Sequence, residues 1–425
     1  MKKATRIERT AMPDALSRLE NESLTFLRRL GEIAEVQGMR VYLVGGPVRD
    51  LLLGAPTSDW DVVIEGSGLD FARAVADEFG AMIQEFPQFQ TAKLFFKDGA
   101  SLDVATSREE IYARPGALPK VKAADLQADL FRRDFTMNAL AVALNPGEFG
   151  ALADFFGGYR DLVGKRIRVL HDRSFVEDPT RIFRAVRYEQ RLGFRCEPKT
   201  SRLLQAALKS GVLKKLSGDR VRNEILKMMK EPDPGKCLAH LNAIGAWRAF
   251  DVKYAIHPAW FAPKSGVPAA VAAFNGAKDI DLRVAYLMLL LAGFSQRKRA
   301  TMTQYLHLER HFQKGAVQLS RDTTRLEKLL KCTKPSKYHR VLSPLPAEYI
   351  MYLWVRYPEI RKPIQTYWNR WRGIRLTVSG ADLKDAGIPE GPEMGKIMRT
   401  LLAMKLDGLL LEKDELKTAV QLHGN

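Results

Sequence analysis

Cysteine is scarce in this sequence, and its three copies stand far apart. Cys196, Cys237 and Cys332 form no CxxC pair, which argues against a disulfide framework and against a zinc site. The seven histidines show no HExxH spacing. No uninterrupted apolar run reaches the roughly 18 residues that a membrane span needs, and the first residues lack an apolar signal-like segment. We therefore expect a protein of the reducing cytoplasm with no membrane partner.

Two common nucleotide-binding signatures are also missing. Without GK[ST] the chain has no P-loop, and without GxGxxG a dinucleotide-binding fold is not indicated. Acidic residues are in the minority, since 67 Lys and Arg face 49 Asp and Glu for a formal net charge of +18. This excess favours a polyanionic partner, nucleic acid first, over the alternative of a merely solvated basic surface.

The first third of the chain has the pattern of a mixed α/β unit. Residues 41–44 and 60–64 predict strands, with a short helix between them that Gly54 ends. Asp98-Gly99 stands between two apolar runs within residues 93–105, which predicts a hairpin. After about residue 174 helical periodicity takes over. The expected fold class is α+β, a mixed sheet with helices followed by an all-α remainder.

Clusters of Pro and Gly predict breaks in the chain near residues 231–235, 263–268 and 333–347. With 425 residues the chain is long enough for several compact units. We expect a head over residues 1–150 with a basic N-terminal arm, a helical neck over 151–235, a helical body over 236–335 and a helical tail over 336–425.

An acidic pair stands in SDWDVVIEG, residues 58–66. Side chains alternate along a strand, so Asp59 and Asp61 project to one face while Trp60 projects to the other. Two neighbouring carboxylates repel one another unless a cation lies between them, and their hard oxygen atoms suit Mg²⁺. Asp103, on the neighbouring hairpin strand, supplies a third carboxylate. Three acids on adjacent strands can hold two ions that bridge an attacking hydroxyl and a triphosphate.

Two glycines precede this pair, in LVGGPVRDLLLG, residues 43–54. Without a Cβ, Gly45 and Gly46 let the backbone approach a phosphate, and the helix expected from Val48 offers free N–H groups to it. Arg49 adds a permanent, forked positive charge. The stretch predicts a phosphate site that faces a metal site. The alternative is an ordinary turn followed by surface acids.

The order of these blocks resembles the class II tRNA nucleotidyltransferase and bacterial poly(A) polymerase family. The two blocks are followed by FRRDFTMNALAV at residues 131–142 and by FVEDPTRIFRAVRYEQRLGF at residues 175–194. The resemblance covers residues 40–230, about half of the chain. It implies a DNA-polymerase-β-like catalytic head, an elongated helical neck, body and tail, Mg²⁺ as cofactor, and CTP, ATP and the 3′ end of tRNA as substrates.

Within the last of these blocks, the arginine-rich stretch DPTRIFRAVR at residues 178–187 predicts a helix with one apolar side. The arginines that wind along its other side, to meet phosphate, are Arg181, Arg184 and Arg187. Asp178 lies one turn from Arg181, so both can address one planar ligand. Cytosine and adenine each present an amino donor beside a ring-nitrogen acceptor, which matches a carboxylate and a guanidinium. The resembling family gives its matching Asp and Arg this base-reading role; the alternative is an i, i+3 salt bridge on a solvated helix.

In FRRDFTMNA, Arg133 and Asp134 match family positions implicated in nucleotide binding. A carboxylate can accept from the sugar hydroxyls while an arginine holds phosphate, with Asn138 in support. A helix N-cap is the alternative for Asp134. Residues 106–127 resemble the family's flexible head loop, which is tied to A addition. RPGALPKV and RVLHDRSFVEDP resemble the stand-alone A-adding subgroup, so the product CCA, CC or A stays open.

The helical remainder is basic, with positive segments at residues 296–334 and with YWNRWR at residues 367–372. We expect these aromatic rings to pack in the helical body, with stacking on RNA as the alternative. Residues 379–402 predict a helix, a Gly-Pro turn and another helix. The positive body and tail are expected to bind the acceptor arm of tRNA by shape and charge. The sequence leaves the oligomeric state open.

Together these features predict an enzyme that adds C, A or both to the 3′ end of tRNA without a template, by a two-metal mechanism. Asp59 and Asp61 are the expected metal ligands, with Asp103 as a catalytic helper. The residues expected to bind the nucleotide are Gly45, Gly46, Arg49, Arg133, Asp134, Asn138, Asp178, Arg181, Arg184 and Arg187. The rival functions are a poly(A) polymerase of the same family, a small-molecule nucleotidyltransferase, and a noncatalytic RNA-binding protein with a degenerate head.

Overall fold

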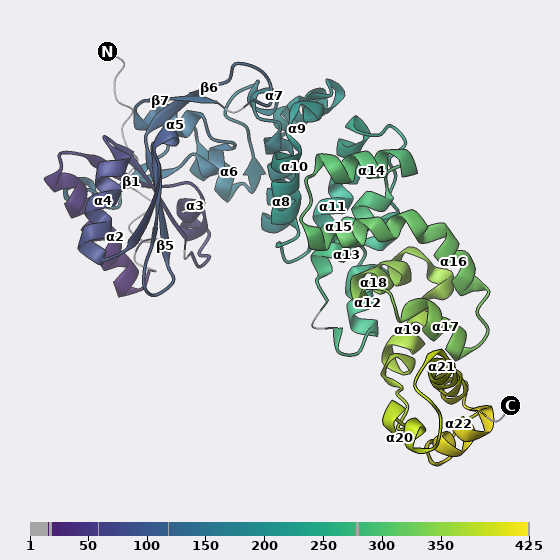
Figure 1. Cartoon of the computed structure of the whole chain (residues 1–425). Coiled ribbons are helices and arrows are strands. Elements are labelled where there is room, and N and C mark those ends of the chain that lie inside the picture. Colours follow the sequence, from purple (N-terminus) through teal and green to yellow (C-terminus); the bar gives the residue numbers. More distant parts are fainter. Residues whose placement is uncertain (1–15, 17–18, 58, 118, 278–279, 424–425) are drawn as a thin grey trace. The chain divides into compact units, whose positions relative to one another are not determined.

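A computed structural model of the chain describes residues 16, 19–57, 59–117, 119–277 and 280–423 (Figure 1). The chain divides into two compact units, Met1–Arg220 and Val221–Asn425. The first unit contains the predicted head and most of the predicted neck, and the finer division into four segments stays a prediction. The basic N-terminal arm lies outside the described residues.

A seven-stranded mixed sheet forms the centre of the first unit. In spatial order its strands are β3 (Met82–Phe86), β4 (Thr91–Phe95), β5 (Ser101–Thr106), β2 (Asp59–Glu65), β1 (Arg40–Val44), β8 (Ala141–Ala143) and β9 (Leu152–Ala153). β2 and β5 run parallel, and the other neighbouring pairs of this sheet run antiparallel. The two predicted strands are confirmed as β1 and β2, and Asp98-Gly99 lies in the turn between β4 and β5.

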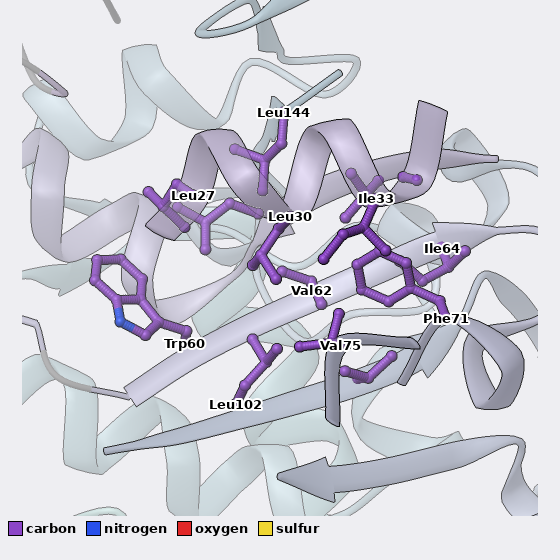
Figure 2. Close-up of a cluster of buried hydrophobic side chains, with 14 of the residues drawn as sticks. Leu27, Leu30, Ile33, Trp60, Val62, Ile64, Phe71, Val75, Leu102 and Leu144 are labelled. Carbon is purple, nitrogen blue, oxygen red and sulfur yellow. The ribbon is translucent and has the colours of Figure 1, made fainter. Parts of the chain in front are cut away.

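Apolar layers cover both faces of this sheet. α2 (Asn21–Val36) and α4 (Gly68–Phe79) lie on one face (Figure 2). The buried residues of this layer include Leu27, Leu30, Ile33, Trp60, Val62, Ile64, Phe71, Val75 and Leu102. α5 (Leu126–Phe131) packs on the other face, where Val63 of β2 is buried. Because side chains alternate along β2, Asp61 shares the face of Val63 and projects away from Trp60.

The first unit contains further α-helices. They are α3 (Gly46–Leu52), α6 (Gly158–Val163), α7 (Ser174–Glu177), α8 (Thr180–Leu192), α9 (Pro198–Lys209) and the start of α10 (Gly218–Met228). A short 3₁₀ turn, η2 (Thr136–Asn138), follows α5. Two short strands, β10 (Arg166–Ile167) and β11 (Arg195–Cys196), pair in parallel.

The segment expected to be a flexible loop, residues 106–127, contains an antiparallel ribbon instead. Its strands are β6 (Arg108–Ile111) and β7 (Lys120–Ala123). One cross-strand pair has charges of opposite sign, since Glu109 lies opposite Lys122 with 3.5 Å between Oε1 and Nζ. Glu110 is also fixed from outside the ribbon, because Arg132 Nη1 donates to it at 2.8 Å.

The second unit is helical throughout its described residues. After α10 its helices are α11 (Pro234–Ala243), α12 (Val267–Ala273), α13 (Leu282–Ala292), α14 (Gln296–Tyr305), α15 (Arg310–Gln318), α16 (Asp322–Leu330), α17 (Pro335–Leu342), α18 (Ala347–Arg356), α19 (Arg361–Asn369), α20 (Gly380–Asp385), α21 (Pro392–Leu406) and α22 (Glu415–His423). The predicted α+β fold, a mixed sheet followed by helices, is thereby confirmed.

Two local predictions for this unit have different outcomes. The break expected over residues 333–347 is wrong in part, because α17 occupies its middle with Pro335 in the first turn, where proline is tolerated. The expected packing of the aromatics is confirmed for Tyr367 and Trp368, which are buried. Trp368 stacks on Phe274 with 4.8 Å between ring centroids.

Among the helices that the structure describes, none combines the length and the apolar character needed to cross a membrane.

The close approach of α2 to the sheet generates a prediction about stability. A Cβ built on Gly31 would lie 1.9 Å from the carbonyl oxygen of Leu144, a backbone atom that cannot move aside alone. We predict that Gly31→Ala lowers the free energy of unfolding by about 2 to 3 kcal/mol, since overpacking shifts the helix. Gly147→Ala is the matched control, because its Cβ would meet nothing within 4 Å. Urea titration measures both, and equal stabilities for the two variants would contradict the prediction.

Candidate active site

Two acidic residues lie side by side on neighbouring strands of the sheet. Asp61 is the register partner of Asp103 in the parallel pair β2–β5, and Asp103 is in turn opposite Lys93 on β4. Lys93 Nζ lies 2.8 Å from Asp103 Oδ2, and the Asp103 side chain is 47% exposed. Asp103 therefore stands where the hairpin prediction placed it, next to Asp61 and already paired with a lysine.

Asp59 opens β2 opposite Ser101, but its side chain lies outside the described residues. In the described part of the chain, no three His, Cys, Asp or Glu side chains gather closely enough to hold a metal ion. The neighbouring carboxylates of Asp61 and Asp103 are hard oxygen donors, which fit a hard divalent cation. The predicted roles of Asp59, Asp61 and Asp103 stay predictions.

The glycine turn lies at the same end of the sheet as these acids. β1 and β2 are antiparallel, so the end of β1 adjoins the start of β2. Gly45 has a φ of +74°, a conformation that favours glycine, and its Cβ would lie 2.7 Å from Arg133 Nη1. Gly46 begins α3 with no such crowding, since its Cβ would lie 3.7 Å from Arg49 Nη2. Close approach thus explains Gly45 but not Gly46.

Arg49 is buried beside this turn, with 2% of its surface exposed. Its Nη1 donates to Asn138 Oδ1 at 2.8 Å, and its Nε and Nη2 donate to the two carboxylate oxygens of Asp50 at 2.9 Å. Burial acts to lower the pKa of Arg49, but Tyr188 and Asp50 outweigh it and the pKa is raised. The guanidinium is thus fixed and fully charged next to Gly46.

Asp134 is a buried carboxylate that joins two segments of the first unit. Its Oδ2 accepts from Arg184 Nε at 2.7 Å, and its Oδ1 accepts from Asn138 Nδ2 and from the backbone N–H of Phe135, both at 2.9 Å. Burial acts to raise the pKa of Asp134, but Arg184 and Asn138 outweigh it and the pKa lies below its ordinary value. The alternative of a helix N-cap does not hold, because Phe135 occupies the N-cap position of η2.

Arg133 is held against the glycine turn by a carboxylate that the sequence analysis missed. Its Nη2 donates to the buried Asp129 at 3.0 Å, and Asp129 also accepts from Arg132 at 2.7 Å. Burial acts to raise the pKa of Asp129, but the two arginines outweigh it and lower the pKa. The sequence contains one indication of this pair: Asp129 lies four residues before Arg133, a spacing at which two side chains on a helix are neighbours. Asp50, the other missed acid, directly follows Arg49.

The expectation that Asp178 and Arg181 share one helix is wrong. Asp178 follows α7 with φ −124° and ψ 92°, and α8 begins only at Thr180. Pro179 explains the break, since a residue before proline is pushed out of the helical region. Asp178 Oδ1 accepts from the backbone N–H of Thr180 at 3.0 Å and from Arg220 Nη2 at 2.7 Å. Within the described residues no ion pair joins Asp178 to Arg181. The alternative interpretation of these two residues, an i, i+3 salt bridge, therefore does not hold either.

The arginine side of α8 is largely buried, so the alternative of a solvated helix face does not hold. Arg181 and Arg187 are only 4% and 8% exposed. Arg181 Nη1 donates to Ser174 Oγ at 2.6 Å, and its Nη2 donates to the Arg132 carbonyl at 2.5 Å. The helix packs its arginines inward against the segment that carries Asp134. The structure therefore joins Arg49, Asn138, Asp134 and Arg184 in one chain of hydrogen bonds. Arg133 is held separately by Asp129, and Asp178 and Arg181 have other partners.

Family models match two stretches of the chain. Residues 41–168 match the Poly A polymerase head domain, and residues 193–250 match the "Probable RNA and SrmB- binding site of polymerase A". The head model thus covers the sheet, both predicted acids of β2 and the glycine turn.

Similar proteins extend the likeness to nearly the whole chain. A structure of a CCA-adding enzyme in an apo form is 33% identical with a TM-score of 0.84, covering 96% of this chain and 98% of that one. The Thermotoga maritima CCA-adding enzyme complexed with tRNA is 30% identical with a TM-score of 0.81, covering 97% and 98%. The A-adding tRNA nucleotidyltransferase of Geobacter sulfurreducens is 37% identical over 95% of this chain and 47% of its own length. The chain spans about half the length of the curated relatives that it matches.

The buried pair of Asp134 and Arg184 generates a pH-dependent prediction. Asp134→Asn should lower the free energy of unfolding at pH 7 by about 2 to 4 kcal/mol, because it breaks one side of a buried charge pair. A carboxylate with a depressed folded pKa stabilises the protein above its unfolded pKa of about 3.9, and this contribution is lost as the pH falls through the folded pKa. Urea titrations from pH 7 down to about pH 3 should therefore show the difference between variant and wild type shrinking.

Asp70→Asn is the matched control for this prediction, because Asp70 pairs with Arg73 at 3.2 Å on an exposed surface. Its effect should stay within about 0.5 kcal/mol at every pH. A loss for Asp134→Asn that is equally small, or that does not change with pH, would show that the pair is not the stabilising unit described here.

Proposed function

The chain belongs to the CCA-adding tRNA nucleotidyltransferase family, and from this premise we propose that it adds nucleotides to the 3′ end of tRNA without a nucleic-acid template. The observation that carries the proposal is the placement of Asp61 beside Asp103, at the end of the sheet that holds the Gly45 turn and its arginines. Acids next to a phosphate cradle suit phosphoryl transfer to a hydroxyl. We expect the protein to act in the cytoplasm.

The incoming nucleotide is expected to meet positive charge at its phosphates. We propose that Arg49, Arg133, Arg184 and Arg187 bind the triphosphate, together with the backbone N–H of Gly46, whereas the N–H of Gly45 donates to the Leu140 carbonyl at 3.2 Å. Arg49 and Arg133 are already held by Asn138 and Asp129, so little side-chain entropy is lost when a phosphate arrives. Asp134 keeps a lowered pKa and stays ionised, which suits acceptance of a hydrogen bond from the sugar.

The base is expected to be read by Asp178 and Arg181. The donors from Thr180 and Arg220 all go to Asp178 Oδ1, and Oδ2 accepts from none of the described residues. Oδ2 can therefore accept from the amino group of adenine or cytosine, while Arg181 donates to the adjacent ring nitrogen. Uracil and guanine present an oxygen in place of the amino group. A buried mismatch of this kind costs about 1 to 3 kcal/mol.

Members of this family generally use a divalent metal, and we propose Mg²⁺ held by Asp59 and Asp61 with Asp103 beside them. When bound, the ion supplies a lowered pKa for the RNA 3′-hydroxyl and offsets charge on the leaving pyrophosphate. Asp61 and Asp103 orient this centre from rigid strands, and Lys93 reduces the repulsion between the two acids.

The tRNA itself is expected to lie on a basic groove of the second unit. α16 and α17 line a cavity of about 890 Å³. Its positive residues are Arg321, Arg325, Lys328, Lys331, Lys337 and Arg340. Among the described residues, none of the six has a carboxylate within ion-pair distance. Six cations gathered without acids repel one another, and a phosphate backbone relieves this repulsion while releasing counterions.

The proposal favours addition of A as the last step. The Geobacter sulfurreducens and Aquifex aeolicus A-adding enzymes align with 95% and 85% of this chain at 37% and 34% identity. Three tRNAs that end before the first C, after one C and after both, each offered CTP or ATP with Mg²⁺, test both the class and the product. We expect one A to be added to the tRNA that ends in both C residues.

Asp61→Asn should lower the rate of this addition by about a hundredfold or more, since it removes a carboxylate proposed to hold the metal ion beside the reacting phosphate. Asp70→Asn, an exposed acid on α4, should retain the wild-type rate. Incorporation of CTP would extend the product to CCA and overturn the restriction to A. Homopolymer tails on both tRNA and a generic RNA would instead indicate a poly(A) polymerase. Wild-type protein that incorporates nothing would indicate a noncatalytic RNA-binding protein.

The groove gives a separate prediction about tRNA affinity. Replacing Lys328 and Lys337 together by alanine should weaken tRNA binding and reduce the slope of log affinity against log salt by about 1.5, because two phosphate contacts are lost. The affinity for ATP should not change. Lys264→Ala, an exposed lysine of the same unit outside the groove, is the control. A salt slope equal to that of wild type in the double variant would place the RNA elsewhere.

A further inference from the structure

Three arginines of the candidate site surround one aromatic ring. The ring centroid of Tyr188 lies 5.1 Å from Arg49 Cζ, 5.4 Å from Arg184 Cζ and 5.0 Å from Arg187 Cζ. Tyr188 is 6% exposed and belongs to α8, as do Arg184 and Arg187, whereas Arg49 comes from α3. The ring therefore joins positive charges from two helices that are far apart in the sequence.

Guanidinium groups that gather in a buried place repel one another, and the surroundings must offset this cost. Carboxylates contribute, since Asp50 accepts from Arg49 and Asp134 accepts from Arg184. The face of an aromatic ring also attracts cations but carries no net charge. Tyr188 can thus stabilise the arginines without repelling an incoming triphosphate, as a further carboxylate in its place would.

The tyrosine is itself fixed in place. Phe135 meets its ring edge to face, with 6.0 Å between centroids and an angle of 89° between planes. Its hydroxyl oxygen accepts from Arg184 Nη2 at 3.1 Å. Arg184 is therefore oriented at two points, by Asp134 at Nε and by Tyr188 at Nη2.

We propose that Tyr188 is the positioning residue that holds Arg49, Arg184 and Arg187 at the spacing that receives the triphosphate of the incoming nucleotide. The proposal rests on the proposed function, because it takes the arginines as the phosphate-binding group. Tyr188 acts through them and does not touch the reacting atoms. The ring provides the attraction shared by all three arginines, and the hydroxyl sets the orientation of Arg184.

Two substitutions separate these contributions. Tyr188→Leu removes ring and hydroxyl, and should raise the Kd of the full-length protein for ATP with Mg²⁺ by about tenfold. Tyr188→Phe keeps the ring, and should raise it by about twofold to fivefold through the lost hydrogen bond. The loss should decrease from ATP to ADP to AMP, because the arginines are taken to hold phosphate. Calorimetric titration measures all three ligands without requiring turnover.

The binding measurements on the Tyr188 variants can be told apart from a failure of the proposed function. If the protein binds ATP but extends no tRNA, the proposed function fails while the dependence on Tyr188 can still be measured. Tyr254→Phe is the matched control, because it removes one buried hydroxyl that donates to the Leu290 carbonyl at 3.2 Å in the second unit. It should leave the Kd for ATP unchanged. If Tyr188→Leu does not fold, Tyr188→Phe decides. Equal losses for ATP and AMP, or a wild-type Kd in a folded variant, would overturn the proposal.

Discussion

The candidate site depends on one buried carboxylate, Asp134, which connects two parts of the first unit. It accepts from Arg184 on α8 and from Asn138, whose amide oxygen in turn accepts from Arg49 on α3. A single chain of hydrogen bonds therefore runs from the glycine turn, through the segment after α5, to the helix that follows Pro179. A buried carboxylate is costly unless it is paired, so this chain fixes how α8 packs on the segment that carries Asp134.

The same network explains how so many arginines can be gathered beside the sheet. Asp50, Asp129 and Asp134 each hold one or two guanidinium groups, and Tyr188 provides a further, uncharged partner. These partners orient the arginines without neutralising the region completely. A site built in this way is prepared for an anion before the anion arrives, which lowers the cost of ordering the side chains on binding.

Local patterns in the sequence were good guides where a single element was concerned. The strands on either side of the two glycines and the hairpin around Asp98 all form as expected. The predictions were wrong where a residue or strand from outside the predicted element changes the local structure. Pro179 removes Asp178 from α8, so Asp178 and Arg181 do not share one helix. The charged stretch after β5, which was expected to be a flexible loop, forms a ribbon in which Glu109 lies opposite Lys122.

The sequence by itself determined that Asp61 faces away from Trp60, and that a turn able to approach phosphate precedes it. Both follow from alternation along a strand and from the freedom of glycine, which are properties of a few consecutive residues. The sequence also predicted a third carboxylate, Asp103, on the neighbouring strand. Only the tertiary structure decided the register that sets Asp103 opposite Asp61, and that Asp134 holds Arg184 although 50 positions separate them. Strand register and helix packing arise from contacts between distant segments, and no pattern within one segment specifies its partner.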